Sequence, residues 1–132
     1  MVGVEHPSHN GQMVNMDNNL NFNGCKISKD EFNSFLDTLI NKVFAILAIY
    51  EDCEECNDYS MLSLYVFRVS SEIRGFSRLM NINSFISLSS IIEDMREKIS
   101  LKELNKIENF GHKQVKFLVF HCISIIKKEK VL

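Results

Sequence analysis

The pair of residues with the most familiar chemical spacing in this chain is Cys53 and Cys56, which are separated by two glutamates. A redox-active pair at this spacing begins a helix directly after a strand, and a zinc site needs a second pair of ligands. The sequence around these cysteines has neither feature. His121 and Cys122 are neighbours, but adjacent side chains on a helix point in different directions. We therefore expect no metal site and no cofactor.

The remaining polar residues do not have the spacing of a catalytic site. Each histidine is expected to be structural or exposed: His6, His9, His112 and His121. A mixed run of acids and bases is typical of a solvated helix face: Glu93, Asp94, Arg96, Glu97 and Lys98. The sequence has no phosphate-binding loop, serine triad or paired-carboxylate motif. We expect a protein that is not an enzyme.

Gly75 lies inside a segment with strong helical periodicity, where a glycine costs about 1 kcal/mol relative to alanine. Something other than helix formation must therefore favour it. When the apolar stripe of this segment faces the core, an advance of about 100° per residue places Ser71 almost opposite the stripe. Around Ser71 on this outer face lie Leu64, Phe67, Arg74, Gly75 and Arg78.

A missing side chain beside an exposed phenylalanine and two arginines is typical of a docking surface for another protein. In the alternative interpretation, Phe67 and Leu64 pack beneath another segment of the chain, and the glycine at position 75 is neutral. The spacing alone leaves both interpretations open.

Four segments with helical periodicity carry these residues. A capping box from Ser28 to Glu31 begins the first helix, which is expected over 29–51. The second is expected over 59–80, where one apolar stripe follows the helical repeat: Leu62, Val66, Val69, Ile73, Phe76 and Met80. The third helix is expected over 84–98. A second capping box, Ser100 to Glu103, predicts a fourth helix over 101–127.

Four amphipathic helices joined by short connections cannot bury their apolar stripes singly, so the pattern predicts an all-α, antiparallel up-down four-helix bundle over residues 28–128. Pro7 is the only proline, and Gly75 and Gly111 are the only glycines after Cys25. A β-sheet protein of this length would need more proline and glycine residues in its turns. Residues 1–27 are rich in asparagine and lack apolar periodicity, so we expect a disordered tail there.

The charge of the chain is nearly balanced, because its 132 residues include 15 basic and 17 acidic side chains. The balance gives little electrostatic reason for nucleic acid or an acidic membrane as the main partner. The longest apolar run, 43–50, is much shorter than the roughly 20 residues that cross a bilayer, and the N-terminus is too polar for a signal peptide. We expect a cytoplasmic protein with reduced cysteines. We expect neither nucleic acid nor a membrane as its partner.

Residues 67–77, with the sequence Phe-Arg-Val-Ser-Ser-Glu-Ile-Arg-Gly-Phe-Ser, resemble the phosphorylation-site helix of histidine-containing phosphotransfer (HPt) domains. The resemblance is to the first domain of chemotaxis histidine kinases, with the pattern H-x-[IL]-K-G-x-[SA]. It covers residues 60–99, where Asn81 takes the place of the turn glycine and 92–95 that of the acidic segment. It implies a helical bundle. It also implies that Glu93 corresponds to the glutamate that hydrogen-bonds the phosphorylated imidazole.

One departure from the family decides the expected chemistry. Ser71 stands where the family has the phosphorylated histidine, and Arg74 stands where it has lysine. A neutral imidazole nitrogen is nucleophilic near neutral pH, whereas a serine hydroxyl needs a positioned general base. We therefore expect a non-catalytic HPt-like module that binds a response-regulator receiver domain or a histidine kinase. It would act as an adaptor or inhibitor in a two-component pathway.

The expected docking surface lies on the outer face of the second helix. Phe67 and Leu64 would supply apolar contact, Arg74 and Arg78 would face the acidic pocket of a receiver, and Gly75 would permit close approach. The full expected set is Leu64, Phe67, Arg68, Ser71, Arg74, Gly75, Arg78 and Glu93. One alternative is a structural or self-associating bundle with a homodimer interface on this face. Another is a phosphotransfer protein in which Ser71 or a displaced histidine accepts phosphate.

Overall fold

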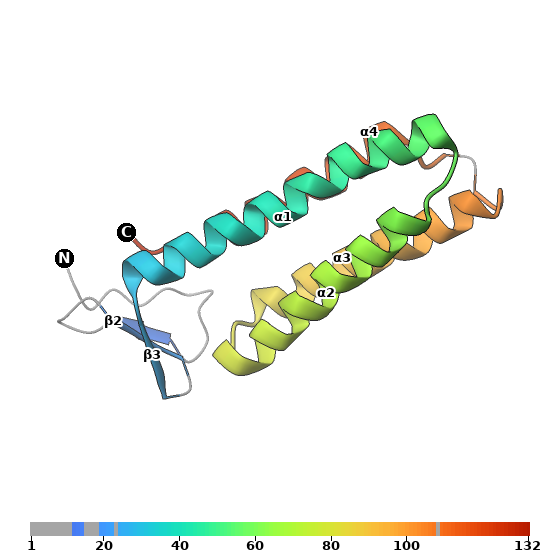
Figure 1. Ribbon diagram of the computed structural model, residues 1–132. Helices are drawn as coiled ribbons and strands as arrows, with labels where there is room; N and C mark the ends of the chain where they lie inside the picture. The colour runs from blue at the N-terminus through green and yellow to red at the C-terminus, as the bar shows by residue number, and fades with distance from the viewer. Residues whose placement is uncertain (1–11, 15–18, 23, 108) are drawn as a thin grey trace.

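The computed structural model describes residues 12–14, 19–22, 24–107 and 109–132. Its four helices are α1 (Lys29–Cys56), α2 (Ser60–Met80), α3 (Ser84–Glu103) and α4 (His112–Lys127). Helix α1 packs mainly against α4, and α2 packs mainly against α3. Each helix runs antiparallel to the next along the chain (Figure 1). The predicted all-α, antiparallel four-helix bundle is therefore confirmed.

The capping box predicted at the start of α1 is present. The Ser28 hydroxyl accepts a hydrogen bond from the Glu31 amide at 3.1 Å and donates one to the Glu31 carboxylate at 3.0 Å. The helix continues past the expected end at residue 51 to Cys56, because Cys53 lies one turn beyond Tyr50 and is buried like it. Asn57, with φ 55°, then ends the helix in the left-handed conformation.

The hydrophobic core lies along the seams between the helices, and α2 and α3 face it as predicted. Helix α2 buries Leu62, Val66, Val69 and Ile73, while Phe76 at the end of the same stripe is half-buried and packs edge-on against Phe35 of α1. The turn at residues 81–83 brings α3 back along α2. Helix α3 buries its own stripe in the same seam: Phe85, Leu88, Ile92, Met95 and Ile99.

The boundary between the third and fourth helices differs from the prediction. The capping box at Ser100 does not form, because α3 continues through that position and ends at Glu103. Asn105, with φ 56°, lies in the connection that follows, and α4 begins only at His112. Leu104 lies within the range expected for the fourth helix, but it is 61% exposed. The fourth helix therefore does not begin at residue 101, and the first buried residue of α4 is Val115.

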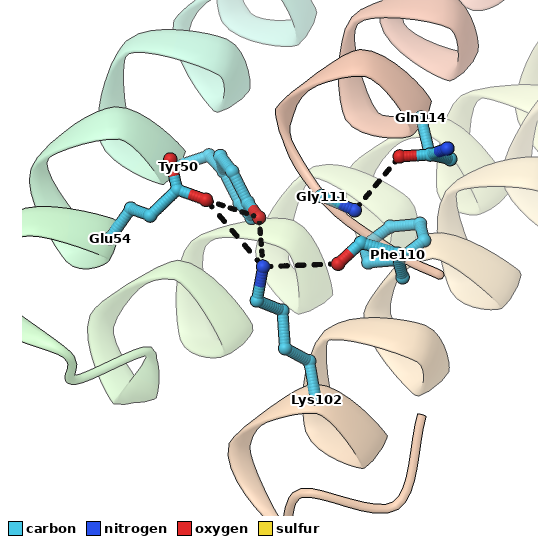
Figure 2. Close-up of polar contacts among 6 residues, drawn as sticks. All are labelled: Tyr50, Glu54, Lys102, Phe110, Gly111 and Gln114. Atoms are coloured by element: carbon cyan, nitrogen blue, oxygen red, sulfur yellow. Dashed lines mark hydrogen bonds and ion pairs between the residues drawn. The ribbon is translucent and has the colours of Figure 1, made fainter. Parts of the chain in front are cut away.

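Lys102 fixes the connection between α3 and α4 (Figure 2). Its ammonium group donates hydrogen bonds to the Tyr50 hydroxyl at 2.7 Å and to the Phe110 carbonyl at 3.0 Å. The Tyr50 hydroxyl in turn donates to the Glu54 carboxylate at 3.0 Å. The side-chain oxygen of Gln114 accepts from the Gly111 amide at 2.9 Å, which caps the start of α4. These contacts hold the end of α1, the connection and the first turn of α4 together.

Three short antiparallel strands precede the bundle: β1 (Gln12–Val14), β2 (Asn19–Phe22) and β3 (Cys25–Ser28), in the order β1-β2-β3. Leu20 and Phe22 are buried, and the Phe22 ring lies 4.9 Å from the ring of Phe32 on α1. The expectation of a disordered tail over 1–27 is therefore wrong for these strands. Alternating Leu20 and Phe22 supply a two-residue repeat that the search for helical periodicity missed. Residues 1–11, 15–18 and 23 lie outside the described residues.

The C-terminus returns to the start of α1 (Figure 1). The Asn33 side chain donates to the Val131 carbonyl at 2.6 Å and accepts from the Val131 amide at 2.9 Å. Lys130 forms an ion pair with Asp37. Val131 is buried by this arrangement. Helices α1 and α4 are therefore joined at this end as well as at the Lys102 end.

Among the described helices, α1 alone is long and apolar enough, by length and composition, to cross a membrane. In the bundle, one side of α1 packs against its neighbours, and this side carries most of its large apolar residues: Phe32, Leu36, Leu39, Val43, Ile46, Leu47 and Tyr50. Core packing therefore accounts for these residues of α1, whereas Phe44 of the same helix is 48% exposed.

Candidate docking surface on helix α2

Six of the eight residues expected to bind a partner share the exposed face of α2. They follow one another at spacings that keep them on one side of a helix: Leu64, Phe67, Arg68, Ser71, Gly75 and Arg78. Leu64 is 52% exposed and Phe67 is 46% exposed. The interpretation in which these two side chains pack beneath another described segment is therefore excluded. We refer to these six residues as the α2 outer face.

Gly75 lies on this face where a side chain would meet open space. A Cβ atom built on Gly75 has no described heavy atom within 4 Å outside its own helix backbone and chain neighbours. Packing within the described chain therefore gives no reason for a glycine here. The helix nevertheless carries the cost of a glycine in its interior, about 1 kcal/mol relative to alanine.

Arg74 and Glu93 were expected at the surface as contacts for a partner, and the structure brings them together. The Arg74 guanidinium of α2 forms an ion pair with the Glu93 carboxylate of α3, and both side chains keep about two fifths or more of their surface exposed, 40% and 46%. In the described structure, Ser71 makes no hydrogen bond to Glu93. The resemblance implied a glutamate directed at the phosphorylation position, whereas the carboxylate is directed at Arg74.

Positive charge dominates the α2 outer face. Arg68 and Arg78 are exposed, and neither forms an ion pair with a described residue. The acid on this helix, Glu72, is paired with Lys42 of α1 at 2.7 Å. Arg96 of α3 lies over the Phe67 ring, 4.8 Å from its centroid, and adds a cation at the edge of the face.

Two shallow grooves flank the α2 outer face. One, of about 370 Å³, lies toward α1 and is lined by apolar side chains that include Ile49, Met61 and Leu64, with Arg68 at one side. The other, of about 410 Å³, lies toward α3 and has a polar lining: Arg74, Ser77, Arg78, Asn81, Ser89, Ser90 and Glu93, together with Ile86. The face is therefore apolar near the start of α2 and polar near its end.

Some exposed residues beside this face were missed by the sequence reasoning. Met61 is 76% exposed and lines the apolar groove, and Ile86 of α3 is 59% exposed and lines the polar one. Met61 precedes Leu64 by three residues, so its position on the helix was a usable signal. Ile86 lies on another helix, and the sequence alone does not show which face of α3 adjoins α2.

The described residues do not assemble a metal centre. They contain no group of three or more His, Cys, Asp or Glu side chains placed to hold a metal ion. Burial raises the pKa of the Cys53 thiol, which disfavours the reactive thiolate. His112 lies 2.8 Å from the Glu51 carboxylate, and His121 is stacked against Phe117. Both histidines belong to α4, away from the α2 outer face.

Comparisons with known proteins do not identify a relative. No protein-family model, no curated protein and no solved structure matches the chain. The geometry of the α2 outer face and the motif at 67–77 are therefore the features that point to a function.

Proposed function

We propose that this chain is a non-catalytic docking module that binds a partner protein through the α2 outer face. The favoured partner is a response-regulator receiver domain, and the alternative partner within the same pathway is a histidine kinase. The observation that carries the proposal is the open space over Gly75, which lies on α2 between the exposed residues Phe67 and Arg78.

The apolar part of the face supplies contact area. Met61, Leu64 and Phe67 are all exposed on successive turns of α2. Such a row loses its contact with water when a partner covers it, and apolar burial is the main driving force of association. About two turns further on, the surface over Gly75 lets the backbone of a partner approach α2 more closely than a side chain would allow.

The charged part of the face supplies orientation. Arg68 and Arg78 make no ion pair with a described residue, so they are available to acidic groups of a partner. Complementary charge steers association and fixes orientation more than it adds affinity. The phosphorylation pocket of a receiver domain is acidic, and the resemblance of 67–77 to an HPt helix implies that such a pocket would lie over Ser71 and Arg78.

A serine at the position of the family's phosphorylated histidine supports a non-catalytic role. Ser71 is exposed, and none of the described side chains is hydrogen-bonded to it as a general base. A serine hydroxyl without a base is a poor nucleophile at neutral pH. A module of this kind would occupy the receiver without exchanging phosphate, and it would thereby block or tether it.

The experiment is a binding titration of the full chain against receiver domains from the same genome, with Gly75→Trp as the test variant. The tryptophan fills the space over α2 and should abolish binding while the helical signal stays unchanged. Thr38→Trp places the same bulk on an exposed position of α1 and is the matched control. The proposal fails if Gly75→Trp binds every receiver that the wild-type chain binds with equal affinity.

Self-association through the same face is the second candidate. The observation that favours it is the exposed row of Met61, Leu64 and Phe67, because an apolar patch of one chain can cover the same patch of a second copy. In that case Gly75→Trp and Arg78→Glu should each convert a dimer to a monomer in a light-scattering measurement. No receiver domain should then bind at any chain concentration.

A further inference from the structure

Helix α4 presents a second exposed stripe, on the other helix pair of the bundle. Its members recur at helical spacing and are all exposed: Lys113, Lys116, Phe117, Phe120, His121, Ser124, Lys127 and Lys128. Phe117 is 71% exposed and Phe120 is 44% exposed. Phe44 of α1, 48% exposed, lies edge-on to Phe120 with a centroid distance of 5.9 Å. We call these nine residues the α4 stripe.

The charge of the α4 stripe is entirely positive. Residues 112–128 include no aspartate or glutamate, and Glu129, which follows, is buried. Two acids of α1 beside the ends of α4 are already engaged, since Glu51 contacts His112 and Asp37 is paired with Lys130. None of the four lysines in the stripe forms an ion pair with a described residue.

The lysines and phenylalanines of the α4 stripe follow a definite order along the helix. Two lysines lie at its start and two at its end, and the exposed phenylalanines lie between them. At about 1.5 Å per residue, Lys113 and Lys128 are roughly 22 Å apart along the helix axis. Phenylalanines flanked by lysines on one face are typical of helices that lie in the plane of an anionic membrane surface.

We propose that the α4 stripe binds an anionic lipid surface. Phe44, Phe117 and Phe120 would enter the boundary between headgroups and acyl chains, and the lysines would contact lipid phosphates and carboxylates. The rings of Phe117 and Phe120 each border an open groove of about 430 Å³ and remain exposed to solvent. The near-neutral net charge of −2 concealed this stripe, because acidic residues elsewhere offset it.

The proposal does not depend on the proposed function of α2. The α4 stripe lies on the α1–α4 pair, whereas the α2 outer face belongs to the α2–α3 pair (Figure 1). A chain with both surfaces would hold a partner protein at a membrane. An experiment can therefore disprove one of the two proposed binding surfaces without bearing on the other.

The chain contains no tryptophan, so Phe117→Trp introduces a single fluorescent probe into the full-length protein. Vesicles of phosphatidylcholine with about one third phosphatidylserine should shift its emission to the blue, and brominated acyl chains should quench it. Vesicles of phosphatidylcholine alone should do neither. Leu64→Trp, on the α2 outer face, should keep the emission of a water-exposed tryptophan with both kinds of vesicle.

The charge contribution is tested with Lys127→Gln combined with Lys128→Gln in the Phe117→Trp background. Each lysine near an anionic surface is worth about 1 kcal/mol, so partitioning should weaken roughly 25-fold. Arg68→Gln combined with Arg78→Gln changes the net charge equally and should leave partitioning unaltered. The proposal is overturned if acidic vesicles cause no blue shift or if the two double variants weaken partitioning equally. It is also overturned if soluble poly-glutamate shifts the emission and vesicles do not, since the stripe would then recognise acidic protein.

Discussion

Arg74 on α2 and Glu93 on α3 form an ion pair across the seam between the two helices, directly beside Gly75. Both side chains remain partly exposed, so the pair lies within reach of a molecule that covers the α2 outer face. An acidic partner would compete with Glu93 for the guanidinium of Arg74. In the proposed function, the ion pair with Glu93 would therefore weaken the binding of an acidic partner to Arg74.

The first prediction follows from that competition. Glu93→Gln releases Arg74 and should tighten binding of a receiver domain severalfold, as measured by calorimetric titration. The same change should alter the free energy of unfolding by less than about 1 kcal/mol, because exposed ion pairs contribute little to stability. Glu97→Gln removes an acid from an exposed position of α3 and is the matched control. Weaker binding by Glu93→Gln would show that the carboxylate itself contacts the partner.

The second prediction concerns the glycine. Gly75→Ala adds a Cβ atom that meets open space, and alanine favours the helix. The free energy of unfolding should rise by up to about 1 kcal/mol in urea denaturation. Gly111→Ala is the contrasting variant, because Gly111 precedes α4 at the cap position, where alanine is less favourable than glycine. A loss of stability in Gly75→Ala would contradict the open space over this position.

The third prediction concerns Lys102, which joins α1 to the connection before α4 (Figure 2). Lys102→Met leaves the Phe110 carbonyl without this donor, and an unmet buried polar group costs about 1–3 kcal/mol. The Tyr50 hydroxyl loses one hydrogen bond but still donates to Glu54. Thermal unfolding should therefore show a loss of stability of about that size. Lys106→Met, at an exposed position of the same connection, should behave like the wild-type chain. Equal stability of the two variants would contradict the role given to Lys102.

The fourth prediction is a pH dependence. Burial raises the pKa of the Cys122 thiol to about 12, above its ordinary value of about 8.5. Because the folded-state pKa is the higher one, this stability is fully present below about pH 8.5 and is lost as the pH rises toward 12. At about pH 10 the loss attributable to this thiol is about 2 kcal/mol.

Urea unfolding at about pH 7.5 and about pH 10 measures that loss. Between these two pH values, the free energy of unfolding of Cys122→Ala should fall by about 2 kcal/mol less than that of the wild-type chain. Cys56→Ala removes an exposed cysteine and should show the wild-type loss. An identical loss in Cys122→Ala and the wild-type chain would contradict the burial of this thiol as its cause.

The helices were predictable because their signals are local. The apolar stripe of α2 and the capping box at Ser28 are both set within a few turns of sequence. The box at Ser100 has the same Ser-x-x-Glu pattern but does not form. The buried Ile99 continues the α3 stripe, and Lys102 is held by Tyr50 of a distant helix. The β2 strand was missed because its signal is only Leu20 and Phe22 among asparagines.

The candidate docking surface was predictable for a related reason. A helical projection places Ser71 and Gly75 opposite the core stripe, and their exposure agrees with that projection. The pairing of Arg74 with Glu93 requires the packing of α2 against α3, which no local pattern specifies. The α4 stripe was hidden by the wrong start of the fourth helix and by the balanced net charge.

Chemical-shift mapping on the nitrogen-15-labelled full chain, titrated with a receiver domain, tests the proposed function most directly. If the α2 outer face is the docking surface, the largest amide shifts should fall between Leu64 and Arg78 and around Glu93, and they should saturate at one receiver per chain. Amides of α4 should stay unchanged in the absence of lipid. Shifts centred on α1 or α4, or no shifts with any receiver domain of the source genome, would contradict the proposal.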